Sequence, residues 1–505
     1  MANKNIFSQP RVRNHAGGIA YQKSAQQTLA QFAMTGTFGD TYYVSGQNQL
    51  EVVLEKANQV SDEFIAKLAI YGRQKGLMKD MPALLCAILV SRQSELADAV
   101  FWKVIDNAKM LRNFVQMMRS GVVGRKSLGS KAKRLVKAFI SKMPEYTLWE
   151  ASVGNSPSLV DILKLAHPKA KDEQRNNLYA YLMGKPADVA RLPEFIRDYE
   201  AFVAGRTNEA PLRAPFQKLT ALPLGEEDWA RIATNAQWQM TRMNLNTFAR
   251  HGVFEQEGMT SLIAERLADR EHVLKARAFP FQLMSAMLNI GPEVPDRVQH
   301  ALEAAMDISL ENVPVIAGTT VIAVDISGSM RDPISGKNGT ATSKVQCVDV
   351  AALVGAALLH KNPHAQIVTF NSECSAFNPA RNGKVMTMAK AIKAKMCGGT
   401  DCGSVMRYLM RENIKAENVL VISDNESWCD RYGTEMSTLW ARYKQYAPEA
   451  RMINLDITPN EYSASADRED TLRVGGFSDE VFNVMQAFLS GNKSQIDVIN
   501  AVSID

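Results

Sequence analysis

Apolar residues recur at three- and four-residue spacing through the first three hundred positions of the chain. The pattern runs from about Gln26 to Ser309 and is clear in residues 62–74 and 97–118. Such spacing is typical of amphipathic helices, and short breaks carrying Gly, Pro or Asn separate the segments. We therefore predict an all-helical domain over residues 1–313. Stacked helical pairs of the HEAT kind would give it a curved surface, and an irregular all-helical domain is the alternative.

The pattern changes near Val313, where β-branched apolar runs begin to alternate with helical segments. Gly318–Ser327 is an apolar run of the kind that forms a buried parallel strand. This alternation predicts a doubly wound α/β domain over residues 314–505, with ligands beyond the carboxyl ends of its strands. The last strand is not evident, and residues 474–491 predict a turn and a closing helix. The other predicted elements are Ser343–Lys361, Gln366–Phe370, Met386–Met396, Asn418–Ser423 and Arg451–Ile457.

Hard oxygen donors gather at the predicted ends of these strands. Asp325, Ser327 and Ser329 form a D-x-S-x-S turn after the first strand, Thr400 precedes a helix, and Asp424 follows a later strand. Oxygen donors suit Mg²⁺ best, with Mn²⁺ or Ca²⁺ as alternatives. A turn that only satisfies backbone amides is the competing interpretation. A phosphatase of the haloacid-dehalogenase type is rejected, because Ser327 stands where that site needs a second aspartate.

Basic residues are concentrated in residues 101–142. This stretch holds 11 Lys and Arg against one acid, Asp106, and such an excess attracts polyanions. Leu128 and the later apolar positions predict a docked helix with Ser127 or Ser130 as its N-cap. Its basic face could bind RNA or could simply be solvated. The candidate RNA-binding residues in this stretch are Lys126, Lys131, Lys133, Arg134 and Lys137.

Several segments in order resemble the Ro/TROVE family. They are the basic helix, Asp161–Lys169 (DILKLAHPK), Met243–Val253 (MNLNTFARHGV), and Gly36-Thr37 with Tyr42-Tyr43, followed by the D-x-S-x-S elements. The resemblance adds His167 and Lys169 to the candidate RNA-binding residues, although His167 could instead be a helix cap or a core histidine. Ser130 departs from the family, where a basic residue is frequent, and Phe139-Ile140 replaces an aromatic pair.

The resemblance implies a HEAT-like helical ring followed by a von Willebrand A domain with a metal-ion-dependent adhesion site. Ser327, Ser329 and Thr400 would ligate the ion, while Asp325 and Asp424 would ligate it or bind its waters. In the family, small noncoding Y RNAs bind the outer basic surface and ends of misfolded RNAs enter the central hole. Bacterial members work beside an exoribonuclease. The implied function is RNA quality control or ribonucleoprotein scaffolding.

Other sequence features narrow the function classes. No apolar run approaches the ~20 residues of a membrane span, and no secretory signal is evident, so a cytoplasmic protein is expected. We also expect the protein to be a monomer. The six cysteines fit no zinc spacing and are expected to be free thiols. Scattered histidines and the absence of clustered carboxylates argue against an enzyme such as a nuclease. The alternative function is a scaffold whose von Willebrand A domain captures an acidic protein partner through the metal.

Overall fold

The structure is a computed structural model that describes most of the 505 residues. The described ranges are 10–36, 38–41, 44–154, 157–208, 211–276, 280–311, 313–334, 344–379, 384–428, 435–476, 478, 480–491 and 493–505. Thr37, Tyr42, Tyr43 and Cys429 lie outside the described residues.

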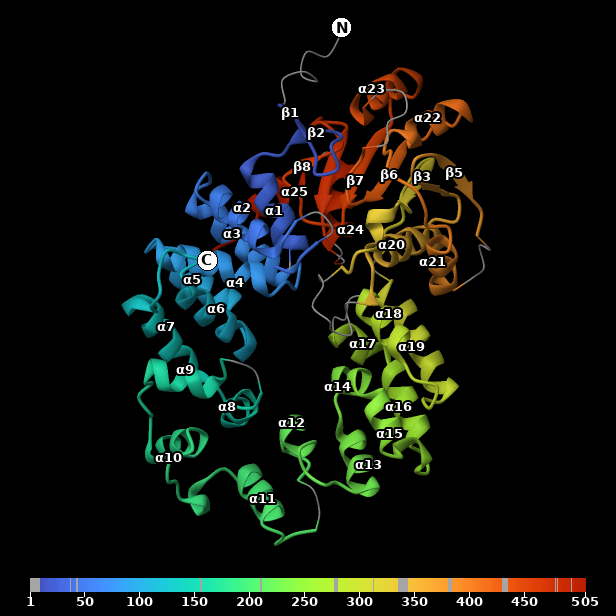
Figure 1. The fold of residues 1–505 in the computed structure, drawn as a ribbon. Coiled ribbons are helices and arrows are strands. Elements are labelled where there is room, and N and C mark those ends of the chain that lie inside the picture. Colours follow the sequence, from blue (N-terminus) through green and yellow to red (C-terminus); the bar gives the residue numbers. More distant parts are fainter. Residues whose placement is uncertain are drawn as a thin grey trace. The chain divides into compact units, whose positions relative to one another are not determined.

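The C-terminal part is built on a six-stranded sheet with the order β5-β4-β3-β6-β7-β9 (Figure 1). All neighbouring strands are parallel except β5, which pairs antiparallel with β4. The doubly wound fold class is therefore confirmed, and β9 is the strand that the sequence left unassigned. The strands are β3 (Thr320–Asp325), β4 (Gln366–Phe370), β5 (Cys374–Phe377), β6 (Asn418–Ser423), β7 (Arg451–Asp456) and β9 (Thr471–Gly475).

Helices cover both faces of the sheet, so β3 is buried along its whole length. On one face α20 packs so closely on β3 that a Cβ at Gly355 would lie 2.7 Å from Cγ2 of Val324. Val321 and Ala323 point to the opposite face, because successive side chains on a strand alternate. The helices of this part are α20 (Cys347–Lys361), α21 (Val385–Lys393), α22 (Ser404–Arg411), α23 (Met436–Tyr446), α24 (Glu480–Gly491) and α25 (Gln495–Asn500).

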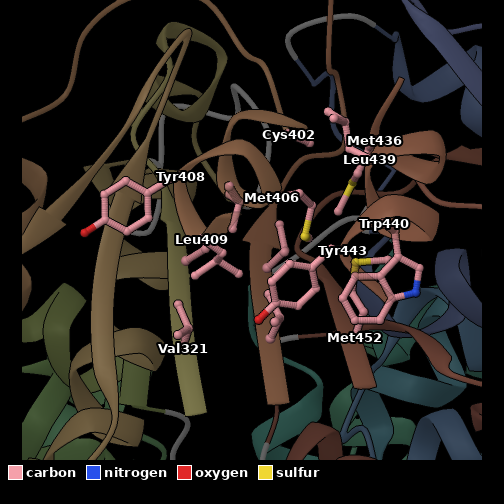
Figure 2. Packing of buried hydrophobic residues seen from close by; sticks show 14 of the residues in the cluster. Val321, Cys402, Met406, Tyr408, Leu409, Met436, Leu439, Trp440, Tyr443 and Met452 are labelled. Carbon is pink, nitrogen blue, oxygen red and sulfur yellow. The ribbon is translucent and has the colours of Figure 1, made fainter. Parts of the chain in front are cut away.

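A hydrophobic cluster fills the space between the sheet and helices α22 and α23 (Figure 2). Trp440 and Tyr443 of α23 are fully buried there, with Val321 of β3 and Leu409 of α22. The indole NH of Trp440 donates to Asp470 over 3.0 Å, so its polar atom is satisfied at the edge of the cluster. The cluster fixes the strands and the loops that follow them.

The first residues of the chain also pack on this C-terminal part. Strands β1 (Arg11–Arg13) and β2 (Ile19–Gln22) form an antiparallel sheet with β8 (Tyr462–Ser463). Helix α1 (Ala25–Thr35) packs on β9, and α3 (Asp62–Gln74) packs on α25. Helix α2 (Gly46–Ala57) lies between α1 and α3 in the sequence. The N-terminal strands were not predicted from the sequence.

The remaining N-terminal chain is helical from α1 to Ser309, as the apolar spacing predicted. Buried stripes such as Met110, Leu111, Phe114, Val115 and Met118 of α6 explain the periodicity. These helices are α4 (Asp80–Ser91), α5 (Ala97–Val104), α6 (Ala108–Ser120), α7 (Gly129–Lys142), α8 (Glu145–Ala151), α9 (Leu159–Ala166), α10 (Glu173–Leu182), α11 (Glu194–Val203), α12 (Phe216–Leu219), α13 (Glu226–Asn235), α14 (Trp238–Met243), α15 (Leu245–Arg250), α16 (Met259–Ala268), α17 (Arg270–Ala276), α18 (Pro280–Asn289) and α19 (Asp296–Ser309).

The chain forms two compact units, and each unit is assembled from three separate segments of the sequence. One unit comprises Met1–Met81, Val273–Asn289 and Glu303–Ser503, and the other comprises Pro82–His272, Ile290–Leu302 and Ile504–Asp505. The predicted boundary near residue 313 marks where helices give way to strand–helix alternation. The compact unit around the sheet also takes in the N-terminal strands and the first helices.

Candidate metal centre and basic helical surface

The D-x-S-x-S turn lies directly after β3, where the backbone leaves the sheet. The Asp325 carboxylate is fully buried and accepts hydrogen bonds from the Ser423 hydroxyl at 2.6 Å and the Ser327 amide at 2.8 Å. The hydroxyl oxygens of Ser327 and Ser329 are 3.4 Å apart. The turn therefore gathers one carboxylate and two hydroxyls at a single point.

Backbone hydrogen bonds join this turn to the other two predicted loops. The Gly328 amide donates to the Gly398 carbonyl at 3.0 Å, which holds the loop carrying Thr400 against the turn. The Thr400 carbonyl in turn accepts from the Trp428 amide at 2.8 Å, four residues after Asp424. Thr400 and Asp424 are both buried. The structure thus brings together the three loops that carry the five predicted metal ligands.

The electrostatics of these loops favour a cation. Burial raises the pKa of Asp325, and the negative charge of Asp424 raises it further. Burial also raises the pKa of Asp424, which the Ser329 hydroxyl partly offsets. Among the described residues no Lys or Arg forms an ion pair with either carboxylate. A divalent ion held by these oxygens would offset the cost of burying two carboxylates.

The oxygen set fits a hard cation rather than a thiophilic one. Within the described part of the chain, no three His, Cys, Asp or Glu side chains are grouped as metal ligands. An ion between these loops would therefore depend on the three hydroxyl groups and on water in addition to Asp325 and Asp424.

A pocket opens beside Ser329 and Asp424, with an empty volume of about 530 Å³ that is partly open to solvent. Glu426 lies in its wall, and burial raises the pKa of this carboxyl to about 7. The N-terminal segment supplies four of the lining residues. The other lining residues are Thr35, Thr41, Val44, Gln49, Asp332, Pro333, Ile334, Cys347, Ile457, Thr458, Pro459 and Asn460.

The turn between β1 and β2 forms hydrogen bonds with the loop that follows Asp424. The Asn14 side-chain amide donates to the Ser427 carbonyl at 2.7 Å, and the Ala16 amide donates to Glu426 at 3.2 Å. Gly18 makes this approach possible, since a Cβ there would lie 1.8 Å from the Ser427 carbonyl oxygen. Sequence analysis missed this hairpin, although two short apolar-containing runs flank Gly17-Gly18.

A buried ion pair fastens the N-terminal segment to the end of β7. Lys23 Nζ lies 2.6 Å from Asp456 Oδ2, and the side chains are 2% and 0% exposed. Burial lowers the pKa of Lys23 and raises that of Asp456, while their mutual attraction opposes both shifts. Sequence alone gave no signal for this pair, because 433 positions separate the partners.

In the other compact unit, the predicted basic helix is α7. Its apolar stripe is buried, so the helix is docked as expected. The predicted serine cap is wrong, because Leu128 is the N-cap residue and the helix has no side-chain cap. The buried stripe consists of Ala132, Leu135, Val136, Phe139 and Ile140.

The candidate basic side chains of this helix fall into two groups. Arg134 forms an ion pair with Asp98 of α5, and Lys131 Nζ lies 3.6 Å from the same carboxylate. Among the described residues, Lys133 and Lys137 have no carboxylate partner, and Lys126 is exposed without one. Among these candidate residues, Lys133, Lys137 and Lys126 thus carry the charge that no described carboxylate neutralises.

The Asp161–Lys169 segment forms α9 and its C-terminal turn. Asp161 makes a capping box with Ser158 at the start of the helix, which is a structural role. His167 is the C-cap residue, with a left-handed backbone at φ 51°, and its side chain is exposed. Lys169 is also exposed. The capping interpretation of His167 describes its backbone, and its exposed ring stays available to a ligand.

The family model described as the Ro60 vWA domain matches residues 319–489. Over nearly its whole length this chain is similar to Ro proteins.

The chain is 25% identical to RNA-binding protein RO60 of Deinococcus radiodurans, with 95% of each chain covered. It is 23% identical to RNA-binding protein RO60 of Caenorhabditis elegans, over 50% of this chain and 40% of that protein. The crystal structure of the Deinococcus radiodurans RO (RSR) protein matches with a TM-score of 0.62 and 20% identity, covering 93% of this chain and 100% of that one. The Ro-type fold predicted from the sequence is thereby confirmed.

In the Met243–Val253 segment, His251 stacks on Trp229 with centroids 4.1 Å apart, so this ring has a packing role. Across the described residues, no helix combines the length and apolar character needed to cross a membrane.

Proposed function

We propose that this protein binds RNA through the basic surface of α7 and its neighbours, defined by Lys126, Lys131, Lys133, Arg134 and Lys137. The observation that carries the proposal is the pair Lys133 and Lys137, four residues apart on a helix whose opposite face is buried. Like charges at this spacing repel, and a phosphate backbone would offset that repulsion. The relatives whose names describe RNA binding support the same conclusion.

The proposed cargo is a small noncoding Y-like RNA, together with ends of misfolded or structured RNAs, held mainly through phosphate contacts. His167 and Lys169 extend the surface at the C-terminal turn of α9, which packs on α7. The protein would act without catalysis of its own, as a cytoplasmic monomer in RNA quality control or as a scaffold. An exoribonuclease is the proposed partner.

The test is the double variant Lys133→Ala/Lys137→Ala, measured by filter binding at several salt concentrations. Loss of two phosphate contacts should lower affinity several-fold and flatten the salt dependence by about 1.8 in log–log slope for a duplex. The matched control is Lys361→Ala/Lys390→Ala, which removes two exposed charges from α20 and α21. An unchanged slope in the first variant, or an equal loss in the control, would contradict the proposal.

We also propose that Asp325, Ser327, Ser329, Thr400 and Asp424 hold a divalent ion, with Mg²⁺ the expected metal and Mn²⁺ or Ca²⁺ as alternatives. The support is the meeting of their three loops and the two buried carboxylates without a basic partner among the described residues. When bound, the ion would supply positive charge and open coordination positions for an oxygen ligand. The chain's own residues would orient that ligand in the adjoining pocket.

A second candidate function is a scaffold that captures an acidic protein partner at this metal. The pocket beside Ser329 and Asp424 favours it, because it opens to solvent next to the proposed ligands. Asp332 and Glu426 in the pocket wall would repel an acidic group, so capture would depend on the ion. The two functions separate experimentally, because loss of the metal site should leave RNA binding intact.

A further inference from the structure

An exposed tryptophan lies beside the basic helix. Trp102 is on α5 and is 38% exposed, although large aromatic side chains usually bury most of their surface. Its indole is held in place by neighbouring rings. The Phe139 ring is nearly parallel to it, at 19° and 6.1 Å between centroids, and the Phe101 ring meets it edge-on at 5.4 Å. The neighbouring rings therefore hold the indole in a fixed position, with part of its surface exposed.

A lysine ammonium group lies over the ring of Trp102. Nζ of Lys142, the last residue of α7, lies 4.0 Å from the indole centroid. Among the described residues Lys142 has no carboxylate partner, and its side chain is exposed. An ammonium on an exposed π face gains only about 0.5–1 kcal/mol. Lys142 can therefore leave the ring for a stronger anionic partner at little cost.

Helix α5 presents two different neighbours to the basic residues of α7: the carboxylate of Asp98 and the indole of Trp102. Asp98 and Trp102 are four residues apart and share one face of α5. At the Asp98 end, Lys131 and Arg134 share the single carboxylate of Asp98. At the Trp102 end, the Lys142 ammonium contacts the face of the indole and no described carboxylate. A partner that combines a flat π system with a nearby negative charge would complement this end.

We propose that Trp102 is a stacking platform for an unpaired RNA base and that Lys142 binds the adjoining phosphate. This inference rests on the proposed RNA-binding function and adds the two side chains that would hold an unpaired base and its phosphate. A base inside a duplex has both faces covered by its neighbours, whereas an unpaired base offers a free face to an aromatic side chain. Stacking of this kind tolerates any base, so no sequence preference is expected.

The experiment compares Trp102→Leu with the parent protein, using a fluorescent oligoadenylate as single strand and a fully paired blunt RNA duplex as second probe. Affinity for the oligoadenylate should fall about five- to 150-fold, because one base loses its stacking partner. Affinity for the duplex and the salt slope should stay unchanged, since no charge is removed. Trp102→Tyr should recover part of the lost affinity, because it restores an aromatic face.

The matched control is Trp428→Leu, which removes an indole that is 49% exposed in the other compact unit. It should bind both probes as the parent does. Equal loss for both probes in Trp102→Leu would overturn the stacking role, as would unchanged affinity for the oligoadenylate. If Lys133→Ala/Lys137→Ala still weakens binding in that case, the proposed function stands and only this inference fails. If neither variant changes binding, the proposed function fails as well.

A second measurement covers the case in which Trp102→Leu folds poorly, as judged by circular dichroism. Oligoadenylate containing one photoreactive base would be crosslinked to the parent protein and the adduct located by mass spectrometry. An adduct on α5 or the end of α7 supports the platform. Adducts confined to other helices overturn it.

Discussion

Removing Asp98 should strengthen RNA binding, which is an unusual result for a change on a binding surface. In the structure the Asp98 carboxylate holds Arg134 and lies 3.6 Å from Lys131. Asp98→Asn keeps the size and polarity of the side chain while removing its charge. Arg134 is then released to meet a phosphate. Lys131 is released less completely, because it also donates to the Ser94 carbonyl at 2.6 Å.

The magnitude follows from how many phosphate groups the released cations can bind. Each phosphate bound by a further cation steepens the log–log salt slope by about 0.9 on a duplex, so Arg134 alone gives about 0.9 and both cations give about 1.8. Between 200 and 50 mM salt, the advantage of the variant should then grow about 3.5-fold for one cation and about twelvefold for two. Folding stability should change by less than about 1 kcal/mol, because the Asp98 and Arg134 side chains are 40% and 60% exposed.

The assay is filter binding of one duplex RNA at four salt concentrations, with urea unfolding as the check on stability. Glu95→Gln removes the same charge close by, and Glu95 has no ion pair among the described residues. It should therefore raise affinity less and leave the slope nearly unchanged. Weaker binding by Asp98→Asn would refute the reasoning, because it would show that Asp98 orients Arg134 toward RNA instead of neutralising it.

The remaining predictions concern the metal loops and the N-terminal segment. Asp325→Ala should weaken Mn²⁺ binding at least tenfold by isothermal titration calorimetry and leave RNA affinity unchanged, whereas Glu449→Gln should change neither; normal Mn²⁺ binding in Asp325→Ala would count against the site. Lys23→Met should lower the free energy of unfolding by about 3 kcal/mol, because it leaves the buried Asp456 carboxylate without its ion-pair partner and with only the charge of Arg473 nearby. The double variant Lys23→Met/Asp456→Leu should regain most of that loss in urea unfolding, and a cost below about 1 kcal/mol for the single variant would contradict the argument.

Part of the fold follows from local patterns alone. The predicted strands Gln366–Phe370 and Asn418–Ser423 have the bounds of β4 and β6. Continuous apolar runs mark them because both faces of the sheet are covered. The α7 stripe was equally visible, because four-residue spacing records which side of a helix is buried. Strand β5 and the hairpin of β1 and β2 were missed, since short strands carry too few residues for a period.

The candidate sites divide in the same way. The order and spacing of Asp325, Ser327, Ser329, Thr400 and Asp424 are properties of the sequence, because parallel strands deliver their following loops to one edge. Which of the basic side chains remain free is not a local property. Arg134 looks like Lys133 in the sequence, yet its partner Asp98 lies 36 positions away and cancels its charge.

By itself the sequence determined the order of a helical part and a von Willebrand A-type domain, the three loops that we propose hold a cation, and the basic character of residues 101–142. Only the tertiary structure decided three contacts. Lys23 forms an ion pair with Asp456, the N-terminal hairpin forms hydrogen bonds with the loop after Asp424, and Lys142 lies over the ring of Trp102. The physical reason is that periodicity records which face of an element is buried. The identity of the partner across that face depends on packing between segments far apart in the chain.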